Sequence, residues 1–292
     1  MTEAPARGTL IRSADAGRRT AAGDADSFRS MVETTVARYL AAVDTVLPGF
    51  VELLYLTGSI ALDAYQPGVS DIDTLIVTSR RPSPEDLAAL ATVHANMPPK
   101  PHLDGVYLDR ETFRQQPADC RVVPFVVDGR FRTDQPCGDL NPVLWLVLTK
   151  YGQAVRGPAV ADLGLTVDHD ELRRFNLDNL ATFWLPLAAN LRAAVADAPD
   201  DTPAEATRVG ADGVVWCALG PARLHFTLAH EDIVSKAGAA AYLAEILPAY
   251  APLADRALRW RRGEPVALTA ADARAAADSV EAVVADAFRR WA

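Results

Sequence analysis

The alternation of apolar and polar residues predicts strands in the first half of the chain and helices in the second. Short runs rich in Val, Ile and Leu and bounded by turn residues are typical of strands. Such runs occupy residues 51–56, 71–77, 102–108 and 121–127, and residues 130–133 are a candidate pairing partner for the last of them. Turns at Gly58-Ser59 and Pro67-Gly68 separate the first two predicted strands.

Helical periodicity occupies most of the remaining chain. Apolar residues at helical spacing predict a helix over 28–46, and Ser83-Pro84 with two acids after it begins another that ends at Pro98-Pro99. The other predicted helices cover 139–151, 170–196 with an interruption near Pro186, 214–228 with an irregularity at Pro221, 235–247 after a Ser235 cap, 248–262 and 269–291.

This order of elements predicts an α+β protein with two folded parts. We expect a flexible N-terminal tail over residues 1–26, a domain with a mixed sheet and helices over 27–160, and an all-α helical bundle domain over 161–292. A chain of 292 residues, half of them hydrophobic, is long enough to build both cores.

Candidate chemistry gathers around the second predicted strand. Side chains alternate along a strand, so Asp71 and Asp73 are expected on one face. Two carboxylates on one face repel each other unless a cation lies between them, and a divalent cation with a preference for oxygen ligands meets this need. The bare backbone at Gly58-Ser59 can hold a phosphate beside it. The pattern predicts a site for a metal–nucleotide complex, and the alternative is a surface strand with two solvated aspartates.

Net charge and cysteine content limit the classes of binding partner and the cellular compartment that we expect. A net charge of −9 argues against nucleic acid, whose phosphates need a basic surface, and is compatible with a small cationic acceptor. Three scattered cysteines predict neither disulfides nor a zinc site, which makes a reducing cytoplasm the expected compartment. The N-terminus lacks the apolar stretch of a signal peptide, and the apolar runs are too short to cross a bilayer. We expect a cytoplasmic monomer without a membrane partner.

The motif over residues 55–77, Gly-Ser followed by Ser-Asp-x-Asp at a strand start, resembles the signature of the polymerase-β-type nucleotidyltransferase superfamily. The resemblance implies Mg²⁺-dependent transfer of a nucleoside monophosphate from a nucleoside triphosphate to an acceptor. It implies that Asp71 and Asp73 hold two Mg²⁺ ions. Gly58-Ser59 and Ser70 would then hold the β- and γ-phosphates.

The resemblance also implies a third acid on the neighbouring strand. Asp104 occupies that position, where a carboxylate can complete metal binding or deprotonate the acceptor hydroxyl. Two alternatives remain: Asp104 is a solvated strand residue, or His102 on the same face is the polar group that acts.

The second half of the chain is similar to the C-terminal domain of the aminoglycoside adenylyltransferases that act on streptomycin and spectinomycin. The similarity rests on residues 217–227, 231–236 and Leu247-Pro248. It implies that Arg223 and Lys236 reach the nucleotide phosphates from the helical domain, and a triphosphate does need cations beyond its metals. The alternative is that both are surface cations, as most Arg and Lys are.

Three positions depart from that family pattern. The acceptor base of the family is usually Glu, and here the position is Asp104, which is one methylene shorter. Trp260 and Arg261 occupy the neighbourhood of an aromatic residue that stacks near the nucleotide. Asp212 is the nearest candidate for the acid that holds the amine of the antibiotic.

Together these features predict an ATP-dependent adenylyltransferase with two Mg²⁺ ions, ATP as co-substrate and an aminoglycoside or aminocyclitol as the leading acceptor. The first alternative is the same chemistry on another small molecule or on a protein. The second is a protein that binds nucleotide or antibiotic without turnover, and intact Asp71 and Asp73 count against it.

Overall fold

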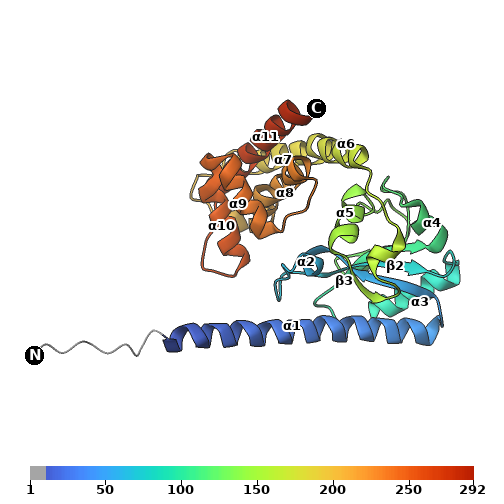
Figure 1. Ribbon diagram of the computed structural model, residues 1–292. Coiled ribbons are helices and arrows are strands. Elements are labelled where there is room, and N and C mark those ends of the chain that lie inside the picture. Colours follow the sequence, from blue (N-terminus) through green and yellow to red (C-terminus); the bar gives the residue numbers. More distant parts are fainter. Residues whose placement is uncertain (1–10) are drawn as a thin grey trace, which may run out of the picture.

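The computed structural model describes residues 11–292, with side chains from Phe28 onward. These residues form a mixed sheet flanked by helices, followed by a helical half (Figure 1). The predicted fold class, an N-terminal mixed sheet with helices and an all-α C-terminal part, is confirmed. Within the described range, no helix has both the length and the apolar character required to cross a membrane.

Six strands form the sheet, in the order β5-β4-β3-β2-β1-β6. Only β2 and β3 run parallel, and every other neighbouring pair is antiparallel. The strands are β1 (Val51–Leu56), β2 (Ile72–Thr78), β3 (Leu103–Asp109), β4 (Phe125–Val127), β5 (Arg130–Arg132) and β6 (Gln153–Arg156). The prediction missed β6, whose side chains are mostly exposed and carry no apolar signal, and it made β4 too long.

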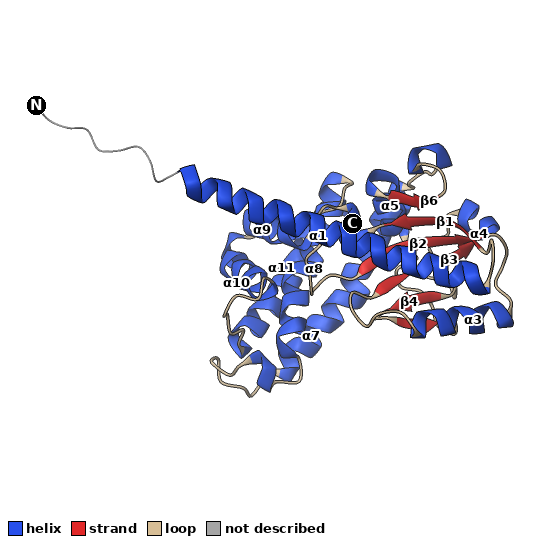
Figure 2. Cartoon of the chain, turned by 90° about the horizontal axis from the view of Figure 1, so that it is seen from below, coloured by secondary structure: helices blue, strands red, loops and turns tan. Residues whose placement is uncertain are grey.

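The helices of the sheet-containing half cover both of its faces. They are α1 (Ile11–Val46), α2 (Gly58–Ala61), α3 (Pro84–Ala95), α4 (Arg110–Gln115) and α5 (Pro142–Tyr151), with a 3₁₀ helix at Val160–Leu163. Apolar residues of α1 and α3 pack against one face of the sheet, and residues of α4 and α5 pack against the other (Figure 2). The helix at α3 begins as predicted, because Ser83 and Asp86 form a reciprocal capping box.

Helix α1 begins earlier than predicted. The sequence suggested a tail up to residue 26 and a helix from 28, whereas the structure has one helix from Ile11 to Val46. This segment contains no proline and is rich in Ala and Arg, which are among the best helix formers. Residues 1–10 of the predicted tail lie outside the described residues.

Strand alternation and register place Asp73 and Asp104 on the same face of the sheet. Asp73 and Asp104 are register partners on the parallel strands β2 and β3. By alternation they lie on the same face as Leu75 and Val106, the face that packs against α5. Because β2 and β3 are parallel neighbours, Asp73 and Asp104 lie side by side at the same end of the sheet, although they are 31 positions apart in the sequence.

The helical half is built on one apolar cluster, rich in alanines that allow the helices to approach closely. Its helices are α6 (His169–Asn179), α7 (Leu185–Ala194), α8 (Gly210–His230), α9 (Lys236–Ile246), α10 (Ala251–Arg261) and α11 (Ala270–Trp291), with 3₁₀ helices at Ala204–Ala206 and Pro248–Tyr250. The interruption predicted near Pro186 is confirmed, because a π-helical turn over Leu180–Trp184 joins α6 to α7. Helix α8 continues through Pro221.

Contacts join the two halves at two places. Leu146 and Val147 of α5 pack with Leu172 and Ile233 of the helical half. Near them, Lys150 Nζ donates a hydrogen bond to the carbonyl oxygen of Glu231 at 2.8 Å. The Tyr151 hydroxyl donates to Oδ1 of Asp232, also at 2.8 Å. On the other side of the interface, the Gln66 side chain donates to the Arg261 carbonyl oxygen at 2.5 Å.

Candidate active site

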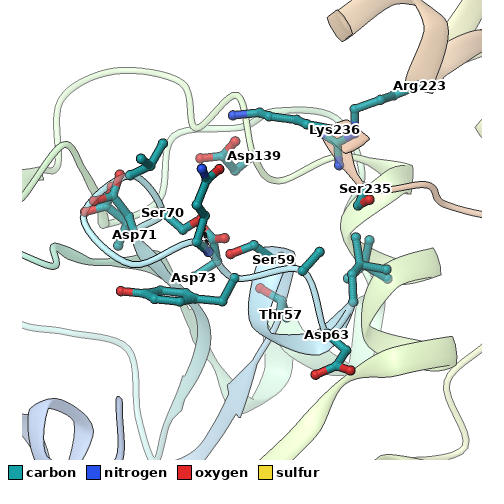
Figure 3. Close-up of a pocket in the computed structure, with 18 of the residues that line it drawn as sticks. Thr57, Ser59, Asp63, Ser70, Asp71, Asp73, Asp139, Arg223, Ser235 and Lys236 are labelled. Carbon is teal, nitrogen blue, oxygen red and sulfur yellow. Dashed lines mark hydrogen bonds between the residues drawn. The ribbon is translucent and has the colours of Figure 1, made fainter. Parts of the chain in front are cut away.

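A cavity of about 800 Å³ lies between the end of the sheet and the helical half (Figure 3). We call it the interdomain cavity. Its acidic side chains come from the sheet-containing half, and its cationic side chains come from the helical half. The acids are Asp63, Asp71, Asp73, Asp104 and Asp139, and the cations are Arg223, Lys236, Arg261 and Arg262.

The turn at Gly58 is shaped around the Asp73 carboxylate. Gly58 has a φ of +55°, in the left-handed region that favours glycine, and it begins the short helix α2. The backbone of Ser59 gives a hydrogen bond to Asp73. The predicted neighbours Gly58, Ser59 and Asp73 therefore do meet in the cavity.

Asp73 lies in an environment that penalises its negative charge. Burial raises the pKa of Asp73 to about 6, the charges of Asp139, Asp104 and Asp71 add to the effect, and the hydrogen bond from Ser59 opposes it. A carboxylate among other carboxylates gains from any cation that binds beside it. The electrostatics thus favour a cationic ligand on the acidic side of the cavity.

Asp71 and Asp104 belong to a group of four residues whose ligand atoms lie close enough together to hold a metal ion. Ligand atoms of Asp71, His102, Asp104 and Asp128 all lie within 4.8 Å of one another. Oxygen-rich sets with carboxylates suit hard divalent cations such as Mg²⁺. Asp71 Oδ1 also lies 3.3 Å from Lys100 Nζ and 3.4 Å from His102 Nδ1, so the Lys100 ammonium already partners this carboxylate.

Asp73 lies outside that four-residue group, although the sequence placed it with Asp71. The physical reason is that β2 begins at Ile72, so Asp71 precedes the strand and the alternation of strand side chains does not govern it. The Asp71 carboxylate points toward the His102 backbone, while the Asp73 carboxylate approaches the Gly58 turn.

Two backbone amides hold the Asp104 carboxylate. Its oxygens accept hydrogen bonds from the amides of Asp128 and Gly129, at 2.8 and 2.9 Å, in the turn between β4 and β5. Burial raises the pKa of Asp104, and these two hydrogen bonds act in the opposite direction. The sequence predicts both Asp104 as a site residue and a turn at Asp128-Gly129, but not that the amides of this turn hold the Asp104 carboxylate.

Asp139 is a site residue that the sequence analysis did not single out. It precedes α5 and lines the cavity beside the other acids (Figure 3). Desolvation by the surrounding protein raises the pKa of Asp139, and the charge of Asp104 adds to this. The only signal in the sequence was its place near a helix start, where Asn141 proves to be the capping residue.

Arg223 and Lys236 reach the cavity from α8 and α9 (Figure 3). Burial lowers the pKa of Arg223, and its Nε donates to the Val234 carbonyl oxygen at 3.0 Å. The pKa of Lys236 is lowered by desolvation first and then by the charges of Arg261 and Arg223, although the side chain keeps an exposed surface. Cations that repel one another in this way favour an anion between them.

The remaining predicted site residues differ in their outcome. Ser70 lines the cavity, and its hydroxyl accepts a hydrogen bond from the Gln66 amide at 3.0 Å. Asp212 lines an adjoining recess instead of the cavity itself. Trp260 lines neither and packs against the core of the helical half, because Leu258 and Arg261 occupy the face of α10 that looks into the cavity.

Comparison with known proteins agrees with this geometry. Residues 37–103 match the family model described as a nucleotidyltransferase domain, which ends one residue before Asp104. No curated protein sequence matches the chain. Among solved structures, the fold is similar to that of spectinomycin adenyltransferase AAD(9) from Enterococcus faecialis, solved with ATP and spectinomycin. The likeness has a TM-score of 0.61 at 13% sequence identity and covers 86% of this chain and 98% of that chain.

These findings bear on two predictions, the fold class and the enzyme class. The match over residues 37–103 to the nucleotidyltransferase domain model supports the predicted transferase, and the order of a sheet-containing half followed by a helical half is shared with the solved structure of similar fold. The likeness at 13% identity concerns the fold, so the reaction and the reactants have to be argued from the cavity.

Proposed function

We propose that this protein transfers AMP from ATP to a hydroxyl group of a small acceptor and releases pyrophosphate. The observation that carries the proposal is the division of charge in the interdomain cavity, with carboxylates on the sheet side and cations on the helical side. A nucleoside triphosphate with its metal ions needs both, since the carboxylates hold the metals and the cations neutralise the phosphates.

The acidic side supplies the metal site of this proposal. Asp71 and Asp104 would hold Mg²⁺ together with His102 and Asp128 of the same group. Two ions are expected, and Asp73, which lies outside this group but lines the same cavity, would be a further ligand. Bound Mg²⁺ would neutralise charge on the phosphates and polarise the α-phosphoryl group. The Gly58-Ser59 turn, Ser70, Arg223 and Lys236 would hold the β- and γ-phosphates, whose negative charge relieves the repulsion between the two cations.

Asp104 is the proposed base. Its carboxylate takes the proton of the acceptor hydroxyl, whose oxygen forms a bond to the α-phosphorus while the bond to the bridging oxygen of the β-phosphate breaks. Pyrophosphate leaves and the acceptor keeps the AMP group. The hydrogen bonds from Asp128 and Gly129 hold this carboxylate in one orientation, which keeps it aimed at the cavity.

The acceptor is proposed to be small and cationic, with an aminoglycoside or aminocyclitol as the leading class. Support comes from the acidic lining of the cavity, from the net charge of −9 and from the fold shared with an enzyme solved with spectinomycin. The same charge argues against nucleic acid. Transfer to another small molecule or to a protein is the alternative, and it would use the same acidic residues.

The test is incubation with Mg-ATP and a panel of aminoglycosides and aminocyclitols, with pyrophosphate release and product mass as readouts. We expect acceptor-dependent pyrophosphate and a product heavier by one AMP group for at least one compound. The variant Asp73→Asn should abolish both signals, and Asp170→Asn, an exposed acid of α6, should not. Full pyrophosphate release by Asp73→Asn would contradict the proposed metal site, and binding of Mg-ATP without turnover on any acceptor would favour a non-catalytic protein.

A further inference from the structure

Gln66 joins the two halves of the molecule at the interdomain cavity, which it lines from the loop between α2 and β2. Its side-chain nitrogen donates to the Arg261 carbonyl oxygen at 2.5 Å, and its side-chain oxygen accepts from the Arg261 guanidinium at 3.3 Å. Arg261 is the last residue of α10 and lines the same cavity from the helical side. The Gln66 amide thus uses its donor and its acceptor on one residue of the other half.

The backbone of Gln66 organises the turn that leads to Asp71. Its carbonyl oxygen accepts hydrogen bonds from the amides of Val69 and Ser70, at 3.1 and 2.8 Å. Its own amide donates to the Ser70 hydroxyl oxygen at 3.0 Å, and Asp71 follows directly in the chain. The position of Gln66 is therefore coupled to the positions of Ser70 and Asp71. Since these three bonds use backbone atoms of Gln66, a change of its side chain leaves them available.

The contact with Gln66 holds the Arg261 guanidinium without neutralising it. Arg259 of the same helix is paired with the carboxylate of Glu264 at 2.8 Å, whereas Arg261 bonds to a neutral amide. The positive charge of Arg261 therefore remains available to a ligand in the cavity. Desolvation lowers the pKa of Lys236, and the charge of Arg261 is the next largest contribution to this shift. Arg261 thus acts together with Lys236, and moving it changes the positive charge that a ligand meets.

The contact between the halves at α5 differs in kind. There, Leu146 and Val147 pack with Leu172 and Ile233, and all four side chains are buried. A buried apolar contact is lost only when much of an interface separates, whereas a small polar contact can open locally. The contact at α5 therefore keeps the halves attached, while the separation of the two cavity walls at Gln66 depends on its hydrogen bonds to Arg261.

We propose that Gln66 is a positioning residue, which keeps the turn before Asp71 at a fixed distance from the cations of the helical side. This inference rests on the proposed nucleotidyl transfer and adds how the two walls of its site are held at a matching distance. A ligand that contacts one wall alone does not depend on this distance. Mg-ATP contacts both walls, so its apparent affinity falls with the fraction of molecules in which the walls lie at the matching distance.

The test compares ligands of one wall with a ligand of both walls, by calorimetry, in the unmodified protein and in Gln66→Leu and Gln66→Asn. Mn²⁺ alone probes the carboxylates, tripolyphosphate without metal probes the cations, and Mg-ATP needs both. Leu has a similar size without polar atoms, and Asn keeps the amide on a side chain that is one methylene shorter. We expect both variants to bind Mg-ATP about five- to ten-fold more weakly, which corresponds to about one hydrogen bond. Binding of Mn²⁺ and of tripolyphosphate should not change.

A matched control separates this effect from a general loss of structure. The Gln116 side chain also uses both of its polar groups on one distant residue, Thr166, at 2.8 and 3.2 Å, but it does not line the cavity. Gln116→Leu should therefore leave all three affinities unchanged.

Two results would overturn the role of Gln66. One is unchanged Mg-ATP affinity in both Gln66 variants. The other is an equal loss of Mn²⁺ affinity, because Gln66 would then support only the local turn. The proposed function is judged separately, by acceptor-dependent pyrophosphate release from the unmodified protein, so the two failures are distinguishable.

Discussion

Gly58 and Asp73 fit together so closely that no side chain can be added to Gly58. A β-carbon built on Gly58 would lie 1.8 Å from the Asp73 Oδ2 atom and 2.5 Å from its Cγ. Both are far below any van der Waals contact, so the carboxylate or the turn would have to move. Gly58 therefore sets the position of the Asp73 carboxylate.

Gly58→Ala should reduce turnover about 100-fold, because a displacement of a catalytic group by about 1 Å has this effect. Gly49→Ala is the matched control, since Gly49 also has a positive φ, of +70°, but nothing lies within 4 Å of its added β-carbon. Both variants should lose about 1 kcal/mol of folding free energy to the left-handed backbone. Steady-state pyrophosphate release and thermal unfolding check this, and equal activity of the two variants would contradict it.

Asp104→Asn should separate chemistry from nucleotide binding. The amide cannot take a proton, so we expect a rate about 10²–10⁴-fold lower in single turnover and a much smaller change in Mg-ATP affinity. In Asn one carboxylate oxygen is replaced by an NH₂ group, which cannot accept a hydrogen bond, so the bond from either the Asp128 or the Gly129 amide is lost. That loss should cost about 1 kcal/mol of stability. If Mg-ATP affinity falls in parallel with the rate, Asp104 is mainly a metal ligand, and an unchanged rate would move the role of base to Asp139 or His102.

Lys236→Ala should weaken Mg-ATP binding roughly ten-fold or more, because one charge-assisted hydrogen bond to a phosphate is lost. Lys236 is a cleaner probe than Arg223, which also holds the Val234 carbonyl oxygen and therefore has a structural role. Arg173→Ala, which removes an exposed cation of α6 that is paired with Asp170, is the control. Calorimetric titration measures the affinity of both variants for Mg-ATP. Equal affinities would place the triphosphate away from the helical half.

The buried His94 should make the protein less stable in mild acid. Burial lowers the pKa of His94 to about 4, from an ordinary value of 6.5, and its Nε2 lies 2.7 Å from the Tyr107 hydroxyl. The unfolded chain thus binds a proton below pH 6.5 that the folded protein takes up only near pH 4. Stability is full above pH 6.5 and falls as the pH drops through this window, by at most about 3 kcal/mol.

Denaturant unfolding of the unmodified protein and of His94→Gln at several pH values between 4 and 7 tests this. The variant should be less stable at pH 7 and should lose part of the pH dependence, whereas His230→Gln, at an exposed position, should retain the full slope. The same slope in His94→Gln would mean that other groups cause the acid sensitivity.

The sequence was informative where the chemistry is local. Gly58, Ser59, Ser70, Asp71 and Asp73 lie within one short stretch, and both their turn and their strand leave clear signals. The mutual arrangement of Asp71 and Asp73 was not predictable, because it depends on the residue at which β2 begins.

Site residues contributed by distant segments were harder to identify. Asp139 looked like part of a helix start, and its place among the acids follows only from how α5 packs on the sheet. Trp260 and Arg261 are adjacent in sequence but lie on different faces of α10, so Trp260 packs against the core and Arg261 lines the cavity. The adjoining recess, lined by Trp184 and Trp216, depends on the π-helical turn before Pro186 and on the packing of α8, neither of which has a sequence motif.

The strand β6 has a practical consequence for anyone who divides this chain. It pairs with β1 from a position about a hundred residues downstream, after α5. A fragment that stops at the end of α5 would leave β1 as an open edge, with unpaired backbone groups that invite aggregation. Since β1 leads directly into the Gly58 turn, such a fragment would also lose support for the nucleotide site. An isolated N-terminal half therefore has to extend past Arg156, and past the apolar residues Val160 and Leu163 that pack on the same core.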